Sequence, residues 1–407
     1  MRHHPVTASS ARVALLFTAL ATLPIPAVHA EDAAETHWRL FVGDHAEPVV
    51  RALDVRDGSV AGTFRIDQTP ALTASSSGET VFAVQGEAGK VAVIDTGFAL
   101  DDHGEHRDIK VEAPSLLAVK LDGKTPAHVV DGGGTIAVFD DGTGEVTRFA
   151  EGDLAESAFT PRKIAAGAAH HGLAAPMGRY FVVSVPDEDA EKPRRGLRVI
   201  DSDGKPVGET VACPGVHGQA SSGRMFAFGC KDGVVLAEPG AAGEAPTLRH
   251  LSTADLGPGN VSTLKGGTAM RFFLGNYGPD AVVIIEPGAE NPFRKVDLPA
   301  RRVDFALDPA KPRNAFILTE DGHLHRLDVL TGKIEASAAV TEPYSIDGHW
   351  RDPRPRLAVA GDLLAVTDPR KGLVRLVALD TLKEARTIAV EGMPYTIVAV
   401  GGSGATH

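Results

Sequence analysis

The sequence predicts an all-β protein built from one repeated four-stranded unit, and three observations support this. A short strand that ends in an acidic residue and a turn recurs eight times, at Asp54, Asp95, Asp140, Asp201, Glu238, Glu286, Asp328 and Asp380. Each interval also holds a second apolar run, such as Val81–Val84. Helical periodicity is nearly absent. Short antiparallel strands at this spacing, joined by glycine turns, are typical of a single closed β-propeller with four-stranded antiparallel blades.

The number of blades follows from the repeat. Eight units predict eight blades, and seven is the alternative because the interval from Asp140 to Asp201 is long and the stretch before Leu363 is irregular. The first unit lacks an inner strand, whereas an additional strand, Pro394–Val400, follows the last unit. We expect this strand to complete the first blade and close the ring, which removes the exposed edges of an open sheet.

The N-terminus has the pattern of a secretory signal peptide. Arg2 and Arg12 supply a positive n-region, Val13–Leu23 form an apolar core, and Val28–Ala30 is a small-residue cleavage site. The core is too short to span a bilayer. We therefore predict an exported periplasmic protein without membrane insertion. The expected organisation is a signal peptide over 1–30, a flexible N-terminus over 31–37, a β-propeller over 38–400 and a disordered tail over 401–407.

The charge argues against some classes of partner. The formal net charge is −12, and cleavage removes two arginines and no acid, which leaves −14. Such a chain is not expected to bind nucleic acid or anionic lipid but is suited to cations. The sequence contains no G-x-S-x-G, H-E-x-x-H or P-loop motif. We expect a protein that is not an enzyme and that acts as a monomer.

The two cysteines, Cys213 and Cys230, both lie in the mature part. In an oxidising compartment they predict one disulfide, which would contribute about 3 kcal/mol in the chain-entropy model. The closed loop contains His217 and would stiffen its hairpin.

Two histidines depart from the repeat at the start of the inner strands. Aligned on the glycine turn that follows, this position holds Leu72 in blade 2, Leu116 or Leu117 in blade 3, His171 in blade 4 and His217 in blade 5. Neutral imidazoles that converge in this way are suited to zinc. In the alternative interpretation each ring only hydrogen-bonds a carbonyl or water. A third ligand could come from Glu112, Asp304 or His349.

A second candidate is the loop Asp101–Asp108, where His103, His106 and Asp108 lie close together beside a glycine. It suits a borderline metal, and a solvated acidic turn is the alternative. The loop joins the third and fourth strands of blade 2, which places it opposite the start of the inner strands. We therefore expect two separate sites unless the loop folds inward.

Other histidines are expected to be structural. They include the isolated His45, His128 and His250.

The chain resembles the AztD-type periplasmic zinc metallochaperones over essentially its whole mature length. The resemblance rests on Trp38–Pro48, the loop Asp101–Asp108, the segment Ala169–Gly172 and the stretch Cys213–Cys230. It implies Zn²⁺ binding in the periplasm and handover to the solute-binding protein of a zinc ABC transporter. His37 is the only histidine before Trp38 in the expected mature chain, which departs from a histidine-rich N-terminal arm.

The resemblance also implies which residues bind metal. These are His171 and His217, and in second place His103, His106 and Asp108. Two alternative functions remain at this stage, a metal-dependent lactonase-like propeller enzyme and a metal-free protein-binding propeller.

Overall fold

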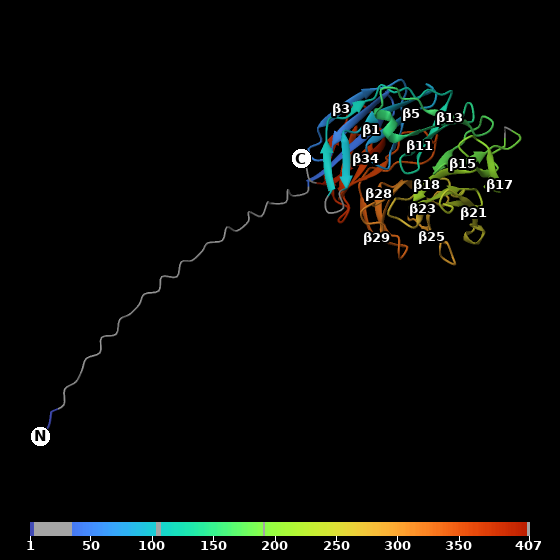
Figure 1. Cartoon of the computed structure of the whole chain (residues 1–407). Coiled ribbons are helices and arrows are strands. Elements are labelled where there is room, and N and C mark those ends of the chain that lie inside the picture. Colours follow the sequence, from blue (N-terminus) through green and yellow to red (C-terminus); the bar gives the residue numbers. More distant parts are fainter. Residues whose placement is uncertain (4–34, 103–106, 190–191, 405–407) are drawn as a thin grey trace. The chain divides into compact units, whose positions relative to one another are not determined.

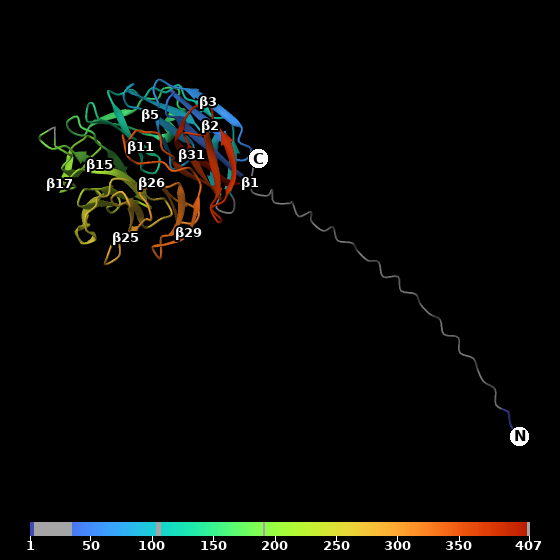
Figure 2. The ribbon, with the colours of Figure 1, turned by 180° about the vertical axis from the view of Figure 1, so that it is seen from behind.

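A computed structural model describes residues 1–3, 35–102, 107–189 and 192–404. The predicted fold is confirmed: eight four-stranded antiparallel sheets follow one another as the blades of a β-propeller. The colours follow the chain in order around the ring (Figures 1 and 2). The first strand, β1, lies beside the last strand, β34 (Figure 1). The expected signal peptide falls almost entirely outside the described residues. Within the described part, no helix is long and apolar enough to cross a membrane.

The strands of blades 1 to 4 are given from the channel outward. Blade 1 contains β34 (Pro394–Gly404), β1 (Glu35–Asp44), β2 (Val49–Asp54) and β3 (Val60–Arg65). Blade 2 contains β4 (Ala71–Ala74), β5 (Thr80–Gln85), β6 (Lys90–Asp95) and β9 (Ser115–Leu116), with the hairpin β7 (Phe98–Asp102) and β8 (Arg107–Val111) inserted before β9. Blade 3 contains β10 (Pro126–Asp131), β11 (Thr135–Asp140), β12 (Glu145–Ala150) and β13 (Arg162–Ala165), with the 3-10 helix η1 (Glu151–Ala155). Blade 4 contains β14 (Ala174–Met177), β15 (Tyr180–Val185), β16 (Gly196–Ile200) and β17 (Pro206–Ala212).

Blades 5 to 8 repeat the same order. Blade 5 contains β18 (His217–Ser222), β19 (Met225–Gly229), β20 (Gly233–Glu238) and β21 (Thr247–Ser252), followed by the 3-10 helix η2 (Ala254–Leu256). Blade 6 contains β22 (Leu264–Lys265), β23 (Phe273–Asn276), β24 (Ala281–Ile285) and β25 (Phe293–Asp297). Blade 7 contains β26 (Arg302–Leu307), β27 (Asn314–Thr319), β28 (His323–Asp328) and β29 (Lys333–Ala339). Blade 8 contains β30 (Leu357–Ala360), β31 (Leu363–Asp368), β32 (Leu373–Ala378) and β33 (Glu384–Ala389).

The ring closes through β34, which supplies the inner strand of blade 1. It pairs antiparallel with β1, with Arg39 opposite Val400 and Phe41 opposite Val398. Glu35 of β1 pairs with Gly404 of β34, so the two strands include residues that we expected to flank the propeller. Closure therefore joins the two ends of the folded part by main-chain hydrogen bonds.

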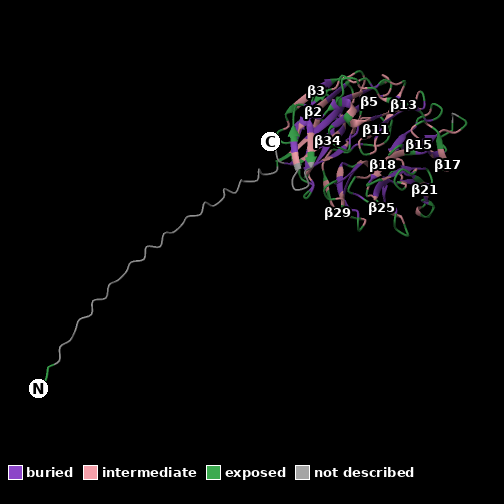
Figure 3. Ribbon diagram, in the orientation of Figure 1, coloured by how far each residue is buried: buried purple, intermediate pink, exposed green. Residues whose placement is uncertain are grey.

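The core lies between neighbouring blades. The second strands β5 and β15 are buried along their whole length, because both of their faces pack against another blade. Burial on both faces explains their continuous apolar runs, which lack the alternation of a half-exposed strand. Most buried residues belong to the strands, whereas exposed ones lie in the connecting loops and in outer strands such as β17 (Figure 3). Each fully buried large apolar side chain contributes roughly 1.5–3 kcal/mol.

The glycines used to align the blades occupy the turns after the inner strands. Gly78, Gly178 and Gly223 have φ values of 79°, 65° and 57°. Residues with a Cβ adopt this left-handed region at a cost, which is why glycine marks the turn. The repeat alignment based on them places the inner strands of blades 2, 4 and 5 correctly.

The inner strand of blade 3 lies elsewhere than predicted. Leu116 belongs to β9, which pairs with β6 as the outer strand of blade 2. The inner strand is β10, which contains His128 and pairs with β11. The error has a local cause: the hairpin β7–β8 precedes β9, and β9 is only two residues long.

Candidate metal centre

Three histidines from three successive blades converge at one end of the central channel. His128 lies on β10, His171 precedes β14, and His217 begins β18. The ring centres of His128 and His171 are 5.1 Å apart, those of His171 and His217 5.7 Å, and those of His128 and His217 6.3 Å. Zn–N bonds of about 2.0–2.1 Å with tetrahedral angles place ring centres roughly 5–5.5 Å apart. The three imidazoles therefore have nearly the spacing of a zinc site.

Hydrogen bonds orient two of the three rings. His171 Nδ1 lies 2.6 Å from Asp141 Oδ2, and Asp141 Oδ1 accepts a hydrogen bond from the Gly172 N–H at 3.0 Å. His217 Nδ1 lies 3.0 Å from the Ser262 carbonyl oxygen. A ring that donates through Nδ1 keeps the lone pair on Nε2, which is how histidines that ligate metal are usually held. Both rings therefore keep the Nε2 lone pair available for a metal ion.

The surroundings keep His128 and His217 neutral at pH 7. Burial, followed by the proximity of His171 and His217, lowers the pKa of His128 to about 4, against the opposing effect of Asp141. Burial also lowers the pKa of His217. Only neutral imidazole binds a metal ion, so protons compete weakly with metal at these two rings.

The cluster opens onto a cavity of about 890 Å³. Its wall includes His171, His217 and Asp141 on one side and residues of distant blades on the other, among them His45, Trp350 and Arg351. Trp350 is 70% exposed, and Arg351 forms an ion pair with Glu87 across the cavity wall. A metal ion at the histidines can therefore be reached from outside the ring.

The structure brings together His171 and His217, as the repeat predicts, and it corrects the expectation for His128. We expected His128 to be isolated, and this was wrong because blade 3 was aligned on the wrong strand. The sequence contained the signal: His128 lies six residues before Gly134, as His217 lies six before Gly223.

The three residues considered as a third ligand lie elsewhere. The Glu112 carboxylate pairs with Lys110, and Asp304 accepts a hydrogen bond from the Leu357 N–H. His349 accepts one from the Arg351 N–H in the loop before blade 8. The third ring that lies against His171 and His217 belongs to His128.

The second candidate site is only partly described. His103 and His106 lie outside the described residues, and Asp108 lies on β8, opposite Asp101 of β7. The base of this hairpin contacts the far end of β34: a Cβ on Gly402 would lie 3.1 Å from Leu100. Thr396, near the other end of β34, lines the histidine cavity. The hairpin therefore leaves the ring at the face opposite the histidine cluster.

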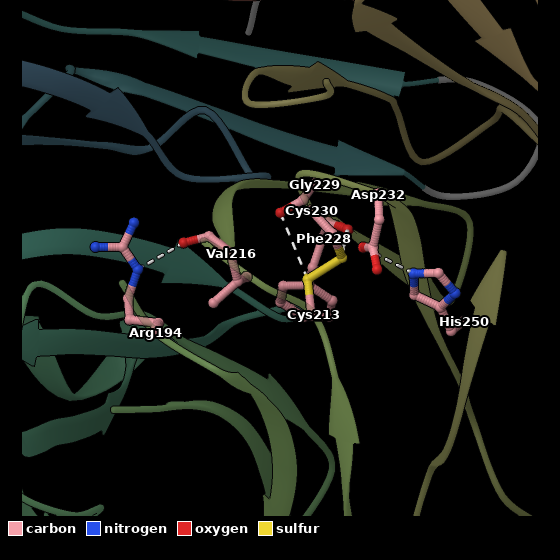
Figure 4. The surroundings of a disulfide bond; sticks show 8 residues. All are labelled: Arg194, Cys213, Val216, Phe228, Gly229, Cys230, Asp232 and His250. Carbon is pink, nitrogen blue, oxygen red and sulfur yellow. Dashed lines mark hydrogen bonds and ion pairs between the residues drawn. A yellow bond between two sulfur atoms is a disulfide. The ribbon is translucent and has the colours of Figure 1, made fainter. Parts of the chain in front are cut away.

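The disulfide between Cys213 and Cys230 is present, with a Cα–Cα distance of 5.0 Å (Figure 4). Val216 lies inside the closed loop, and its carbonyl oxygen accepts a hydrogen bond from Arg194 Nε at 2.7 Å. Val216 immediately precedes His217, so the disulfide and this hydrogen bond fix the start of β18 from two sides.

Comparison with known proteins identifies close relatives. The zinc chaperone AztD of Citrobacter koseri is 45% identical over 400 residues, which cover 97% of this chain and 94% of that protein. The crystal structure of Citrobacter koseri AztD matches with a TM-score of 0.89 at 45% identity, over 92% of this chain and 100% of that one. This chain belongs to the AztD family. The structure of apo AztD from the same organism matches with a TM-score of 0.85 at 43% identity, over 91% and 99% of the two chains. No protein-family model matches the sequence.

Membership in the AztD family confirms the resemblance and supports a zinc chaperone role. The curated AztD relative is a chaperone and not an enzyme, as expected from the sequence.

One further group of potential ligands occurs in this AztD-family chain. Atoms of Cys230, Asp232 and His250 lie within 4.8 Å of one another (Figure 4). The Cys230 sulfur is bonded to Cys213 and cannot act as a thiolate ligand, which leaves only the His250–Asp232 pair at 3.2 Å. This group is therefore the weaker candidate for a metal centre.

Proposed function

We propose that this protein is a periplasmic zinc chaperone that binds Zn²⁺ through His128, His171 and His217. The ion would be passed to the solute-binding protein of a zinc ABC transporter. The proposal is supported by the convergence of three imidazoles from three blades at nearly the spacing of a zinc site.

The chemistry of this ligand set suits binding and transfer. Three neutral nitrogens leave the fourth position of a tetrahedral zinc ion to water or to an incoming ligand. A ligand of a partner protein could enter there through the open cavity, so that zinc changes hands within a complex. Asp141 would hold His171 in place during the exchange without binding the metal itself, since both of its oxygens are already engaged.

The loop with His103, His106 and Asp108 remains a proposed second metal-binding segment. Its hairpin leaves the opposite face of the ring, so it would act separately, in capture or handover.

The direct test is a competition titration with a zinc-selective chelator. We expect His128→Ala, His171→Ala and His217→Ala each to weaken zinc binding by more than about 100-fold, since even changes behind the ligands cost 10–100-fold. His250→Ala is the matched control, because His250 lies outside the cluster, and should bind as the wild type does. Equal affinity in all four variants would refute the site. Purified wild type without metal would instead favour the metal-free scaffold.

Handover can be tested with the loaded protein and a zinc-binding partner. The rate of transfer should rise with the concentration of the partner if zinc is exchanged within a complex. A rate that depends only on spontaneous release would contradict direct handover.

A further inference from the structure

A second cavity, of about 320 Å³, lies along the central channel. Its charged lining comes from the inner strands of blades 6 and 7 and from the residue that precedes the inner strand of blade 8. The charged residues in this lining are Lys265, Arg302, Asp304 and Arg356. Three cations thus face one carboxylate, in a protein whose overall charge is strongly negative.

The single carboxylate forms no ion pair with either arginine, although its charge acts to raise the pKa of both. Asp304 Oδ2 accepts a hydrogen bond from the Leu357 N–H at 3.0 Å, and Asp304 Oδ1 accepts one from the Phe305 N–H at 2.9 Å. Within the described part of the chain, neither Arg302 nor Arg356 has a carboxylate oxygen within ion-pair distance. The cavity therefore has an excess of positive charge.

Arg302 has an unused donor. Its Nη1 is buried and has no hydrogen-bond partner among the described residues. Burial lowers the pKa of Arg302, the charge of Arg356 lowers it further, and Asp304 acts in the opposite sense. A buried guanidinium without an ion pair costs free energy, and an anion in the cavity would offset that cost.

Arg356 lines this cavity and is held in place by Tyr395, which lines the neighbouring histidine cavity. Its Nη2 donates to the Tyr395 hydroxyl at 2.9 Å, and its guanidinium carbon lies 5.1 Å from the centre of the Tyr395 ring. The hydrogen bond to Tyr395 uses one nitrogen of the Arg356 guanidinium. A guanidinium has five N–H donors in total, so further donors of Arg356 remain for a ligand.

We propose that this cavity binds a small oxyanion through Arg302 and Arg356, with Lys265 adding charge. A guanidinium fork matches the paired oxygens of phosphate and carboxylate groups. Water occupies about 30 Å³ per molecule in the liquid, so the cavity has room for such an anion and several waters. The ligand is inorganic phosphate or the carboxylate of a small metabolite. The proposal does not depend on zinc binding.

The test is calorimetric titration of chelator-treated, metal-free protein at constant ionic strength. The probes are inorganic phosphate, succinate and chloride. We expect phosphate or succinate to bind, and Arg302→Met to weaken that binding about tenfold or more, as loss of a charged hydrogen bond does. Arg271→Met is the control, because Arg271 is exposed and lies outside the cavity.

The probes also identify the ligand. Tighter phosphate binding assigns an inorganic oxyanion, and tighter succinate binding assigns a carboxylate. Response to chloride alone, no binding of any probe, or equal binding by wild type and Arg302→Met would overturn the proposal.

A second measurement covers the case in which Arg302→Met does not fold. Crystals of the wild-type protein soaked in selenate should show an anomalous selenium peak in the channel beside Arg302. Peaks only on the outer surface would overturn the proposal.

Discussion

Blades 5 and 7 differ in chemistry at the same position of their inner strands. His217 pairs with Gly229, the last residue of the second strand of blade 5, and Arg302 pairs with Thr319, the last residue of the second strand of blade 7. A bulge follows in both strands. In blade 5 this position contributes a neutral imidazole to a cavity suited to a cation, and in blade 7 it contributes a guanidinium to a cavity suited to an anion.

The propeller fold fixes the positions of these residues but does not fix their chemistry. The backbone places corresponding parts of the inner strands at the channel, and different residues there create different sites. The two cavities share Arg356 and Thr396 in their linings, so they are neighbours along one channel. Histidines gather over blades 3 to 5 and arginines over blades 7 and 8.

The largest expected effect concerns the closure that holds both groups in one ring. Deletion of the last fifteen residues, Met393–His407, removes β34 and leaves β1 with an unpaired edge. An exposed edge strand promotes association between chains. We expect insoluble or aggregated protein, measured by expression and size-exclusion chromatography.

A matched control for the truncation is deletion of residues 405–407 alone, which lie beyond β34. This variant should stay soluble and keep its melting temperature. A monomeric protein with unchanged melting temperature after the fifteen-residue deletion would show that closure does not stabilise the ring.

The part of the site that could be predicted from the sequence is the part that repeats. His171 and His217 stand where glycine turns give a reliable register. His128 was missed because the inserted hairpin and the two-residue β9 disturbed the count between blades 2 and 3. A signal for His128 existed in the glycines that follow it.

The arginine cavity has no comparable signal. The site at Arg302 and Arg356 is visible only in the structure, where Asp304 accepts hydrogen bonds from backbone N–H groups and forms no ion pair with either arginine. Such a choice of partner depends on three-dimensional packing across two blades. It cannot be read from spacing along the chain.

The next effect separates the two sides of the channel. The disulfide lies in the connection to blade 5 and supports only the histidine side. Replacing Cys213 and Cys230 by serine should lower the free energy of unfolding by about 3 kcal/mol in the chain-entropy model. The measurement is urea unfolding of both proteins without metal, with alkylation and mass spectrometry to show that wild-type thiols are protected.

The same variant should differ from the wild type in zinc binding but not in phosphate binding. Zinc affinity should fall, because the start of β18 loses one of its two supports, whereas phosphate binding near Arg302 should stay unchanged. Two freely alkylated thiols in the native protein would contradict the disulfide. An equal loss of both ligands would show that the two sides are not independent.

The smallest effect is a pH dependence that belongs to the histidine side. Because burial lowers the pKa of His128 from 6.5 to about 4, the folded protein binds fewer protons than the unfolded chain between these values. Lowering the pH through this window therefore stabilises the unfolded chain more and reduces the free energy of unfolding. The shift of His128 accounts for at most about 2 kcal/mol of the loss between pH 7 and pH 5. His171, His217, Asp141 and Arg194 surround the ring and contribute to the shift.

Urea unfolding of the metal-free protein at pH 7 and pH 5 measures this term. His128→Asn removes the titrating ring, so its free energy of unfolding should depend less on pH than that of the wild type. His250→Asn serves as the control, since it leaves the cluster intact, and should keep the wild-type slope. Carboxylates that titrate in the same range are common to all three proteins and cancel in the comparison. If His128→Asn and the wild type lose the same stability on acidification, His128 is not held neutral by the cluster. The low proton competition that we assign to this zinc site would then lose its physical basis.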